Sequence, residues 1–522
     1  MKFIEGKDRS QLTLFPVSLD ASISTDNEVR LIDLFVDGLP LEEMGFQSIF
    51  VENGRPAYHP KDLLKLFIYG YLNRIRSSRS LEKECKRNIE LIWLLKGLEP
   101  DHNTINRFRK ENPKSIKKVF RKTVEIARNF DLIGGLLIAG DSTRLRAQNS
   151  KKNNYNQKKI ARHLAFIEEK LASYTQALSE ADGDKAEELE AKIAEKKKRQ
   201  ATYQGLSEKI KESGDTQYSS SDPESRHIMV RGMISEVCYN VQSTVDSKNK
   251  LPIDYKVTNE NDSNALSMMV RRAKSIVGHN RFTVLFDKGY HKGEELSKVH
   301  ELGVRTYVAI PDIPGSAQAP DPAYNTEHFT NNAVTDQYTC PAGAQLLSNQ
   351  RVYRYDQPTY GFKKYKTRAC ATCKVRAGCT RSKQGRMVQR SEYQPAVDRN
   401  KSNLQDHPEL YRARARIVEH PFGTLKRQWG FDYILTKKGM ASASSDVGFM
   451  FIAYNLRRLF KLLGKEGLRK LFATKIAIYW VELPQNSWLE LRILLKALLL
   501  RFFSKSQWKG LFTNYYIFER GF

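Results

Sequence analysis

The sequence has few cysteines and no long uncharged apolar run. Its 522 residues include six cysteines, too few and too clustered for a disulfide framework, so a reducing compartment is expected. No uncharged apolar run reaches the roughly 20 residues that a membrane-spanning helix needs. No apolar core follows the charges in the opening stretch MKFIEGKDRSQLTLFP, so no secretory signal is expected there. These absences predict a cytoplasmic protein without a membrane partner.

Acidic residues are also in short supply. The chain has 59 Asp and Glu against 86 Lys and Arg, which gives a net charge of +27. Such an excess predicts a polyanionic partner, most plausibly nucleic acid. The alternative is a ribosome-associated or simply basic protein. The length is sufficient for two to four domains.

One acidic residue stands alone in a basic stretch, RARARIVEHPFGTLKRQWG. Arg412 and Arg416 precede Glu419 by seven and three residues, and Lys426 follows it by seven, so a helix would bring all four near one face. We expect Pro421 to kink the helix or make it restart. This pattern fits a carboxylate that holds a divalent cation beside a phosphodiester. It fits equally well an ordinary basic amphipathic helix with an internal salt bridge.

Two upstream aspartates could complete a metal site. Asp141 ends the apolar run in GGLLIAGDSTRLRAQNSK, and Asp287 ends the apolar run in RFTVLFDKGYHKG. Short apolar runs bounded by turn residues are typical of buried strands. An Asp at the end of such a strand projects into the crevice where α/β proteins bind their ligands. Each Asp taken alone is better explained as a turn or cap residue, but two of them together with Glu419 favour a metal site.

The combined motifs resemble those of a known family. GDSTRLRA, CYNVQSTVD, LFDKGY, a cysteine cluster and YRARARIVEHPFGTLK are together similar to the DDE-type transposases of bacterial insertion sequences, in particular the longer branch with a cysteine cluster before the catalytic Glu. Tyr411, Glu419 and Lys426 match the Tyr, Glu and Lys of the family's Tyr–Arg–Glu–Lys signature. The arginine of the signature is Arg414 or Arg416, because four residues separate Arg414 from Glu419 where the commoner form has three.

The resemblance implies a ribonuclease-H-like fold, with the first Asp on the first strand, the second on the fourth and the Glu on a later helix. The expected class is therefore α/β, with this catalytic core over residues 131–460. An all-helical DNA-binding domain over 1–130 would precede the core, and a helical tail over 461–522 would follow it. Insertions over 151–226 and 311–410 would interrupt the core.

The resemblance also implies the chemistry and the partners. Two Mg²⁺ ions, for which Mn²⁺ can substitute, would be held by Asp141, which bridges both, and by Asp287 and Glu419, which each complete one. Water would cut the element's end, and the freed 3′-hydroxyl would join target DNA by transesterification. Partners would be the terminal inverted repeats and target DNA, bound by a homodimer associated with the nucleoid. The DNA phosphates near the cut would be held by Tyr411, Arg414, Arg416 and Lys426.

A polar segment near residue 105 predicts end recognition. Asn103, Thr104, Arg107 and Arg109 lie close together in PDHNTINRFRKENPKS and all carry hydrogen-bond donors. Such an inventory suits a recognition helix in a major groove. The alternative is a polar surface helix of a helical bundle.

The two insertions differ in character. The first carries an apolar heptad-like seam from Ile160 to Leu178, a turn, and a second charged helix to about Lys211, which predicts an antiparallel hairpin with a structural or dimer-forming role. The second contains the close cysteine pair that can make a thiolate zinc site; the alternative is four reduced thiols. The cysteines concerned are Cys340, Cys370, Cys373 and Cys379.

The end of the chain and the overall function leave alternatives. LELRILLKALLLRFF predicts an amphipathic helix for packing or dimerisation, with a membrane-surface role as the weaker option. A metal-dependent nuclease of the same fold without strand transfer would use the same three carboxylates. A DNA-binding relic without activity is the non-enzymatic alternative.

Overall fold

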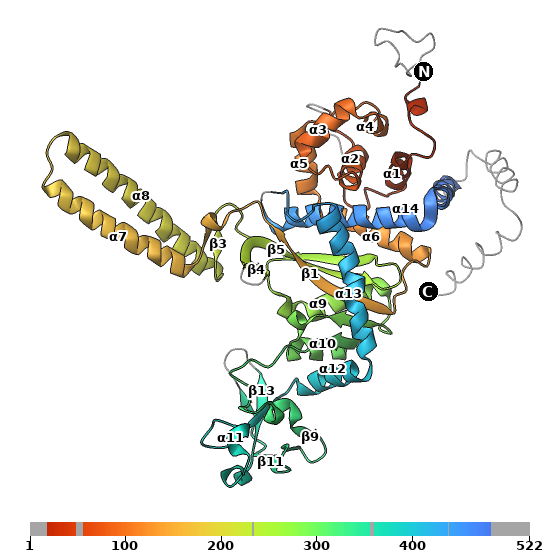
Figure 1. Cartoon of the computed structure of the whole chain (residues 1–522). Coiled ribbons are helices and arrows are strands. Elements are labelled where there is room, and N and C mark those ends of the chain that lie inside the picture. The colour runs from red at the N-terminus through yellow and green to blue at the C-terminus, as the bar shows by residue number, and fades with distance from the viewer. Residues whose placement is uncertain (1–17, 48–55, 232–233, 355–359, 437, 482–522) are drawn as a thin grey trace, which may run out of the picture.

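The structure is a computed structural model that describes residues 18–47, 56–231, 234–354, 360–436 and 438–481. It is a mixed α/β molecule with more than one sheet, which confirms the expected class. A helical part, a central sheet covered by helices, a projecting helical hairpin and a small second sheet can be followed in Figure 1. Within the described ranges, no helix is both long and apolar enough to cross a membrane. The predicted tail helix, LELRILLKALLLRFF, lies outside the described residues.

The front of the chain is helical, because its apolar residues recur at helical spacing and its helices begin at suitable residues. The Asp101 side chain accepts hydrogen bonds from the backbone N–H groups of Asn103 and Thr104 and so caps the helix that follows. Pro60 and Pro113 each begin a helix, where their missing N–H is not needed. The helices are α1 (Glu28–Asp37), α2 (Pro60–Leu72), α3 (Ser78–Arg87), α4 (Ile89–Leu94), α5 (His102–Glu111) and α6 (Pro113–Asn129).

These front helices share one hydrophobic core with α14 (Met440–Val481), the last described helix. Phe67 of α2 stacks on Phe449, with 4.7 Å between the ring centroids. The hydroxyl of Tyr71 donates to the buried carboxylate of Asp446. The same core continues onto one face of the central sheet, so the packing is continuous across residue 130, where the sequence predicts a domain boundary.

The central sheet has β1 in its middle. Its strands are β1 (Leu137–Arg146), β4 (Arg226–Arg231), β5 (Ile234–Asp246), β6 (Pro252–Thr258), β7 (Thr283–Phe286) and β8 (Arg305–Val308). β5 is antiparallel to β1, and both β4 and β6 pair with the other edge of β5. On the opposite side of β1, β7 and then β8 are parallel to it. β1 and β7 therefore lie where the apolar runs before Asp141 and Asp287 predict strands.

Different helices cover the two faces of this sheet, because alternate residues of each strand point in opposite directions. Val284 and Phe286 belong to the core that includes α9, whereas Leu285 between them packs against Ile417 on the opposite face. The covering helices are α9 (Leu266–Val277), α10 (Gly293–Glu301), α12 (Gln394–Asp406) and α13 (Pro408–Phe422). α13 lies across β1, β5, β7 and β8, and so passes over the middle of the sheet.

The regular α-helix ends close to Pro421, where the sequence predicts a kink or a restart. α13 ends at Phe422, one residue after the proline, and a π-helical segment, η8 (Gly423–Gln428), follows directly. A proline cannot donate the usual helical hydrogen bond, and a widened turn is one way to accommodate it. Side chains after Pro421 consequently do not point in the directions around the helix axis that a regular α-helix would give them.

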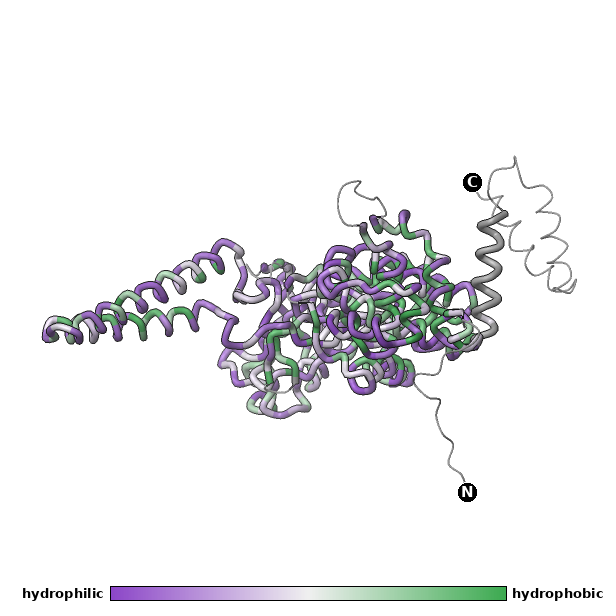
Figure 2. The backbone as a smooth tube through the Cα atoms, turned by 90° about the horizontal axis from the view of Figure 1, so that it is seen from above, coloured by the Kyte–Doolittle hydropathy of each residue, from purple (hydrophilic) through white to green (hydrophobic). Residues whose placement is uncertain are grey.

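The predicted helical hairpin projects from the side of the molecule (Figure 1). Its elements are β2 (Asn154–Tyr155), α7 (Gln157–Ser179), α8 (Asp184–Ser213) and β3 (Tyr218–Ser219). Ile160 and Ile167 are buried, and Leu206 and Ile210 close around Ile160 at the base. Hydrophobic and hydrophilic residues are mixed along both helices (Figure 2), and the rest of the seam, from Leu171 to Leu178, is only half-buried.

The segment between β8 and α12 folds around a small core of its own. Phe329, Tyr338 and Tyr365 are its buried aromatic residues, and Figure 1 shows it at one end of the molecule. Its elements are β9 (Thr330–Asn332), β10 (Gln337–Thr339), β11 (Gln345–Ser348), β12 (Tyr353–Arg354), β13 (Gly361–Lys366), α11 (Arg376–Cys379) and β14 (Val388–Ser391).

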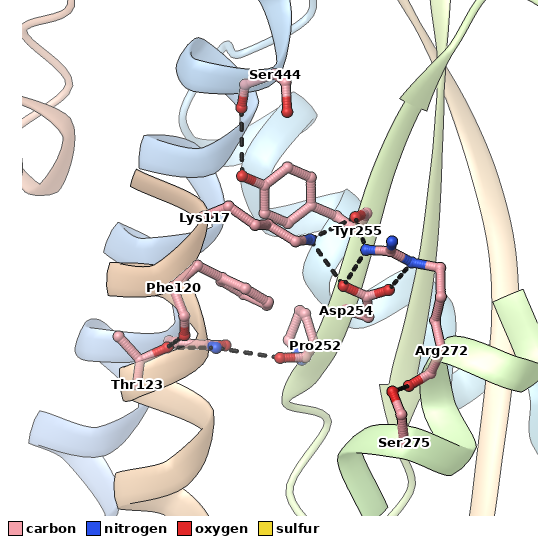
Figure 3. Close-up of polar contacts among 10 residues, drawn as sticks. Lys117, Phe120, Thr123, Pro252, Asp254, Tyr255, Arg272, Ser275 and Ser444 are labelled. Carbon is pink, nitrogen blue, oxygen red and sulfur yellow. Dashed lines mark hydrogen bonds and ion pairs between the residues drawn. The ribbon is translucent and has the colours of Figure 1, made fainter. Parts of the chain in front are cut away.

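A buried ionic cluster joins the front helices to the central sheet (Figure 3). Asp254 of β6, whose side chain is fully buried, accepts a hydrogen bond of 2.7 Å from Lys117 of α6. Arg272 of α9 donates to both of its carboxylate oxygens, at 2.5 and 2.9 Å. Burial raises the pKa of Asp254, but the two cations outweigh burial and leave this pKa below its usual value. One carboxylate thus holds three elements together.

Candidate active site

The structure brings Asp141 and Asp287 to neighbouring positions on adjacent parallel strands. Ala139 of β1 pairs with Leu285 of β7, and each aspartate lies two residues further along its strand direction. Asp287 directly follows β7, as predicted, and its side chain caps the short turn η4 (Lys288–Tyr290) by accepting from the backbone N–H of Gly289. Asp141 does not end its strand, because β1 continues to Arg146.

Arg414 of α13 lies between the two carboxylates. Its Nη2 is 3.1 Å from Oδ1 of Asp141 and 3.7 Å from Oδ2 of Asp287. Burial raises the pKa of Asp141 to about 6, against the opposing effect of Arg414 and of the backbone N–H of Ser142. Two carboxylates that share one cation form a site suited to positive charge. The structure therefore favours Arg414 over Arg416, which is exposed, as the arginine nearest the aspartates.

Two more of the predicted residues lie close to this pair. Tyr411 is half-buried and packs against the cluster that contains Ala139 and Leu285. Burial raises the pKa of its phenol, Arg414 opposes this effect, and the charges of Asp287 and Asp141 add to it. Lys426 of η8 donates to the hydroxyl of Thr143, 3.1 Å away. Thr143 lies two residues after Asp141 and hence on the same face of β1. The predicted lysine thus contacts β1 two residues after the first aspartate, on the same face of the strand.

Glu419 is not in contact with the aspartates in this structure. It lies with Arg412 and Arg416 on the exposed side of α13, whereas Ile417 and Val418 are buried against the sheet. The predicted single basic face is only partly formed, because Lys426 lies within the π-helical segment η8 and points to Thr143 of β1. In the described part of the chain, no group of three or more His, Cys, Asp or Glu side chains is arranged to hold a metal ion.

The proposed recognition helix α5 presents only some of its predicted residues. Asn103 and Arg107 are exposed, and Asn106 and Lys110 lie with them at helical spacing. The hydroxyl of Thr104 donates to Asp101 and takes part in the helix cap.

Arg109 corrects the prediction, because it is only 2% exposed. Its guanidinium donates to the hydroxyl of Tyr71 and to the carbonyl of Arg76 and lies 3.8 Å from Asp446. Arg109 therefore stabilises the junction between α2, α5 and α14 and cannot reach DNA.

The four clustered cysteines line one apolar hollow of the second sheet's segment. Cys340, Cys370, Cys373 and Cys379 are all half-buried free thiols. Burial raises the pKa of Cys379, and the other three thiols add to that effect. The backbone N–H of Ala344 points to the sulfur of Cys340 at 3.3 Å. The chain thus gathers the predicted thiols, although their present spacing is not that of a metal site.

Sequence reasoning missed a group of buried polar residues beside the aspartates. Asp262, which is 8% exposed, accepts hydrogen bonds from the side-chain amides of Asn240 and Gln242. Arg144 donates to the other oxygen of Asp262 at 3.2 Å. The signal that could have found this group is two amide residues spaced by two in β5, Asn240 and Gln242, which alternate with the apolar residues Tyr239 and Val241.

Two segments of the chain match families of known proteins. Residues 17–111 match the family described as Transposase domain (DUF772), and residues 339–460 match the family described as Transposase DDE domain. The second match contains Arg414 and Glu419, and neither match contains Asp141 or Asp287. A search of curated proteins finds no match.

One solved structure is similar over most of its length, a piggyBac transposase in a synaptic complex with hairpin DNA, determined by cryo-EM. The identity is 10%, the similarity covers 88% of this chain and 83% of that chain, and the TM-score is 0.28. This score is too low to support a structural argument. The two family matches define the class, a transposase with a DDE domain. The chain therefore has two segments similar to transposases, residues 17–111 and a DDE domain over residues 339–460.

Proposed function

We propose that the chain is a DDE-type DNA transposase of the long branch of bacterial insertion-sequence enzymes, and that it acts on the ends of its own element. The observation that carries the proposal is the pairing of Asp141 and Asp287 around one shared cation, Arg414. The strand order β6–β5–β1–β7–β8, with its first three strands antiparallel and its last two parallel to β1, supports a ribonuclease-H-like core over residues 131–460. We assign residues 151–226 and 311–410 to insertions in that core, with 1–130 and 461–522 flanking it.

The residues present fit a divalent cation. Mg²⁺ prefers oxygen ligands and is commonly held by one or two protein carboxylates together with substrate phosphates. Asp141 and Asp287 supply two such carboxylates on a rigid sheet, and they already accommodate a positive charge. We assign Asp141 to both of two Mg²⁺ ions, and Asp287 and Glu419 to one each; Mn²⁺ would also serve. Bound ions would supply charge stabilisation of the attacking and leaving oxygens.

Glu419 would complete the site from α13. It lies on the same helix as Arg414, about 7.5 Å further along the axis, but on the exposed side. A turn of α13 about its axis, with Arg414 leaving the aspartates for a DNA phosphate, would bring Glu419 towards the sheet. Lys426 and Arg416 would hold further phosphates, and Tyr411 would pack at the cut.

The chemistry would run in two displacements at phosphorus. In the first, a water oxygen forms a bond to the phosphorus at the element's end, and the bond to the 3′-oxygen breaks, which frees a 3′-hydroxyl. In the second, that hydroxyl forms the new bond to a target phosphate and the target strand's bond breaks. Neither step needs a covalent link between protein and DNA, and Asp141 and Asp287 would orient the reacting phosphate in both.

End-joining tests this function directly. Purified full-length protein would be incubated with labelled terminal DNA of the element, Mg²⁺ and a second DNA. We expect cleavage at the ends followed by joining of the labelled strand to the second DNA. Cleavage without joining would instead support a nuclease of the same fold, and binding without cleavage would support an inactive relic.

The exposed face of α5 is proposed to read the terminal repeats in double-stranded DNA, with two copies of the chain in the complex. Replacing Arg107 with Ala should weaken binding to the specific ends by about tenfold, the size of one lost base contact, as measured by fluorescence anisotropy. Arg87 of α3, which is 59% exposed, is the matched control: its change to Ala removes the same charge from a neighbouring helix. Equal losses for both variants would mean that α5 contributes only charge.

The four gathered thiols are proposed to hold a structural Zn²⁺. We expect about one zinc per chain by native mass spectrometry, since four thiolates form a closed tetrahedral site, and loss of that zinc in Cys373→Ser. Cys85, which is buried in the front core, provides the control variant Cys85→Ser, which should keep the metal. A zinc-free preparation of intact protein would refute the assignment.

We place the enzyme in the cytoplasm, associated with the nucleoid, because its substrate is chromosomal DNA.

A further inference from the structure

Asp262 lies behind the two aspartates, at the start of the turn η3 (Asp262–Asn264) that follows β6. Its Oδ1 accepts hydrogen bonds from Asn240 at 2.8 Å and from Gln242 at 2.7 Å. Both amide residues are fully buried. Ser142 pairs with Gln242 and Arg144 with Asn240 across β1 and β5, so this group lies on the face of the sheet opposite to Asp141.

The same group is connected to the turn that carries Asp287. The hydroxyl of Tyr290, the last residue of η4, donates to the side-chain oxygen of Gln242, and Tyr290 is fully buried. A Cβ atom on Gly289 would lie 3.1 Å from Oδ1 of Asp287 and 3.6 Å from Oδ2 of Asp262. Gln242 therefore links the turns of Asp262 and Asp287, and the two carboxylates approach the same point beside Gly289.

Asp262 also acts on Asp141 through its charge. Burial has the largest effect on the pKa of Asp141, and the carboxylates of Asp287 and Asp262 both raise this pKa further. Asp262 is thus one of the charges that act on Asp141.

We propose that Asp262 is a positioning residue of the divalent-cation site, where it acts as a fixed negative charge behind Asp141 and Asp287. Both of its oxygens already accept hydrogen bonds from Asn240, Gln242 and Arg144. Asp262 therefore orients the residues around the site and does not ligate the ion. A purely structural link between the two turns would not require a charge here, and burying a carboxylate is costly. This inference rests on the proposed metal site at Asp141 and Asp287.

Direct binding of Mn²⁺ to the full-length protein without DNA, measured by calorimetry, tests the role separately from activity. Asp262→Asn keeps the size and one accepting oxygen but removes the charge. We expect its Mn²⁺ dissociation constant to rise by about five- to tenfold, because a nearby buried charge is lost. Asp246 is the matched control: it is a fully buried aspartate at the end of β5 and accepts from the backbone N–H groups of Gly134, Gly135 and Lys248. Asp246→Asn should leave Mn²⁺ affinity unchanged.

A second variant has the opposite expected sign. Arg144→Gln removes the cation that offsets Asp262, and so should tighten Mn²⁺ binding about twofold; weaker binding would contradict an electrostatic role. Wild-type affinity in Asp262→Asn, or an equal loss in Asp246→Asn, would overturn the inference while leaving the proposed function intact. Asp287→Asn separates the two hypotheses: if that variant also binds Mn²⁺ like the wild type, the proposed metal site itself is wrong.

Discussion

Replacing Asp287 with Asn is expected to reduce cleavage of the element's ends on the order of a thousandfold, since it removes one of the two carboxylates assigned to the metal and about 4 kcal/mol of transition-state stabilisation. Asparagine is as good a helix cap as aspartate, so the turn η4 that Asp287 caps should survive. DNA binding measured by fluorescence anisotropy should therefore stay near the wild-type value while the single-turnover cleavage rate collapses. Asp141→Asn should behave alike.

The control for this change is Asp312→Asn. Asp312 is 92% exposed and pairs with Lys288, 3.1 Å away, so its loss removes one negative charge nearby without touching the aspartate pair. If Asp287→Asn cleaves DNA at the same rate as Asp312→Asn, the assignment of Asp287 to the metal site is wrong. Glu419→Gln belongs in the same series. A loss as large as that of Asp287→Asn would support movement of α13 into the site, and an unchanged rate would leave Glu419 as a surface residue.

Replacing Asp254 with Asn should destabilise the fold by about 3–5 kcal/mol, because it leaves two cations facing a buried site without their counter-charge. Lys117 and Arg272 both depend on this carboxylate, and they come from elements on different sides of the front junction (Figure 3). The loss should be visible as a lower midpoint in urea or thermal unfolding followed by circular dichroism.

The matched change is Asp131→Asn. Asp131 pairs with Lys248 at 2.7 Å, but its side chain is 89% exposed, and exposed ion pairs contribute little. Asparagine also tolerates the positive φ of 54° at this position. We expect almost no shift of its midpoint. Equal midpoints for the two variants would show that the Asp254 cluster does not stabilise the junction.

The sequence predicted those parts of the molecule that depend on local patterns. Apolar runs of strand length located β1 and β7, and the residue that ends each run, Asp141 or Asp287, lies at the site. The heptad-like spacing after Ile160 likewise predicted the hairpin of α7 and α8. In each case the pattern of buried residues follows from the spacing of apolar residues that are close together in the sequence.

The features that depend on distant partners could not be predicted in this way. Arg109 looked like a DNA contact, but its partners are Tyr71 on another helix and Asp446 near the end of the described chain. The phase of Lys426 relative to Glu419 is changed by the π-helical segment after Pro421, and spacing rules assume a regular helix. Asp262 was missed because its role depends on strand pairing that brings Asn240 and Gln242 beneath it.

The shared core of α2, α5 and α14 has a consequence for how the enzyme would measure DNA. Phe108 of α5 stacks on Phe67 of α2, which in turn stacks on Phe449 of α14. Tyr255 of β6 stacks on Phe451 of α14, so α2 and α14 connect the helix proposed to read sequence to the sheet proposed to cut DNA. The recognition helix and the catalytic sheet would then stay at a fixed distance from each other. The number of base pairs between the recognised sequence and the broken bond would be set by the span of the folded protein, and not by the length of a tether.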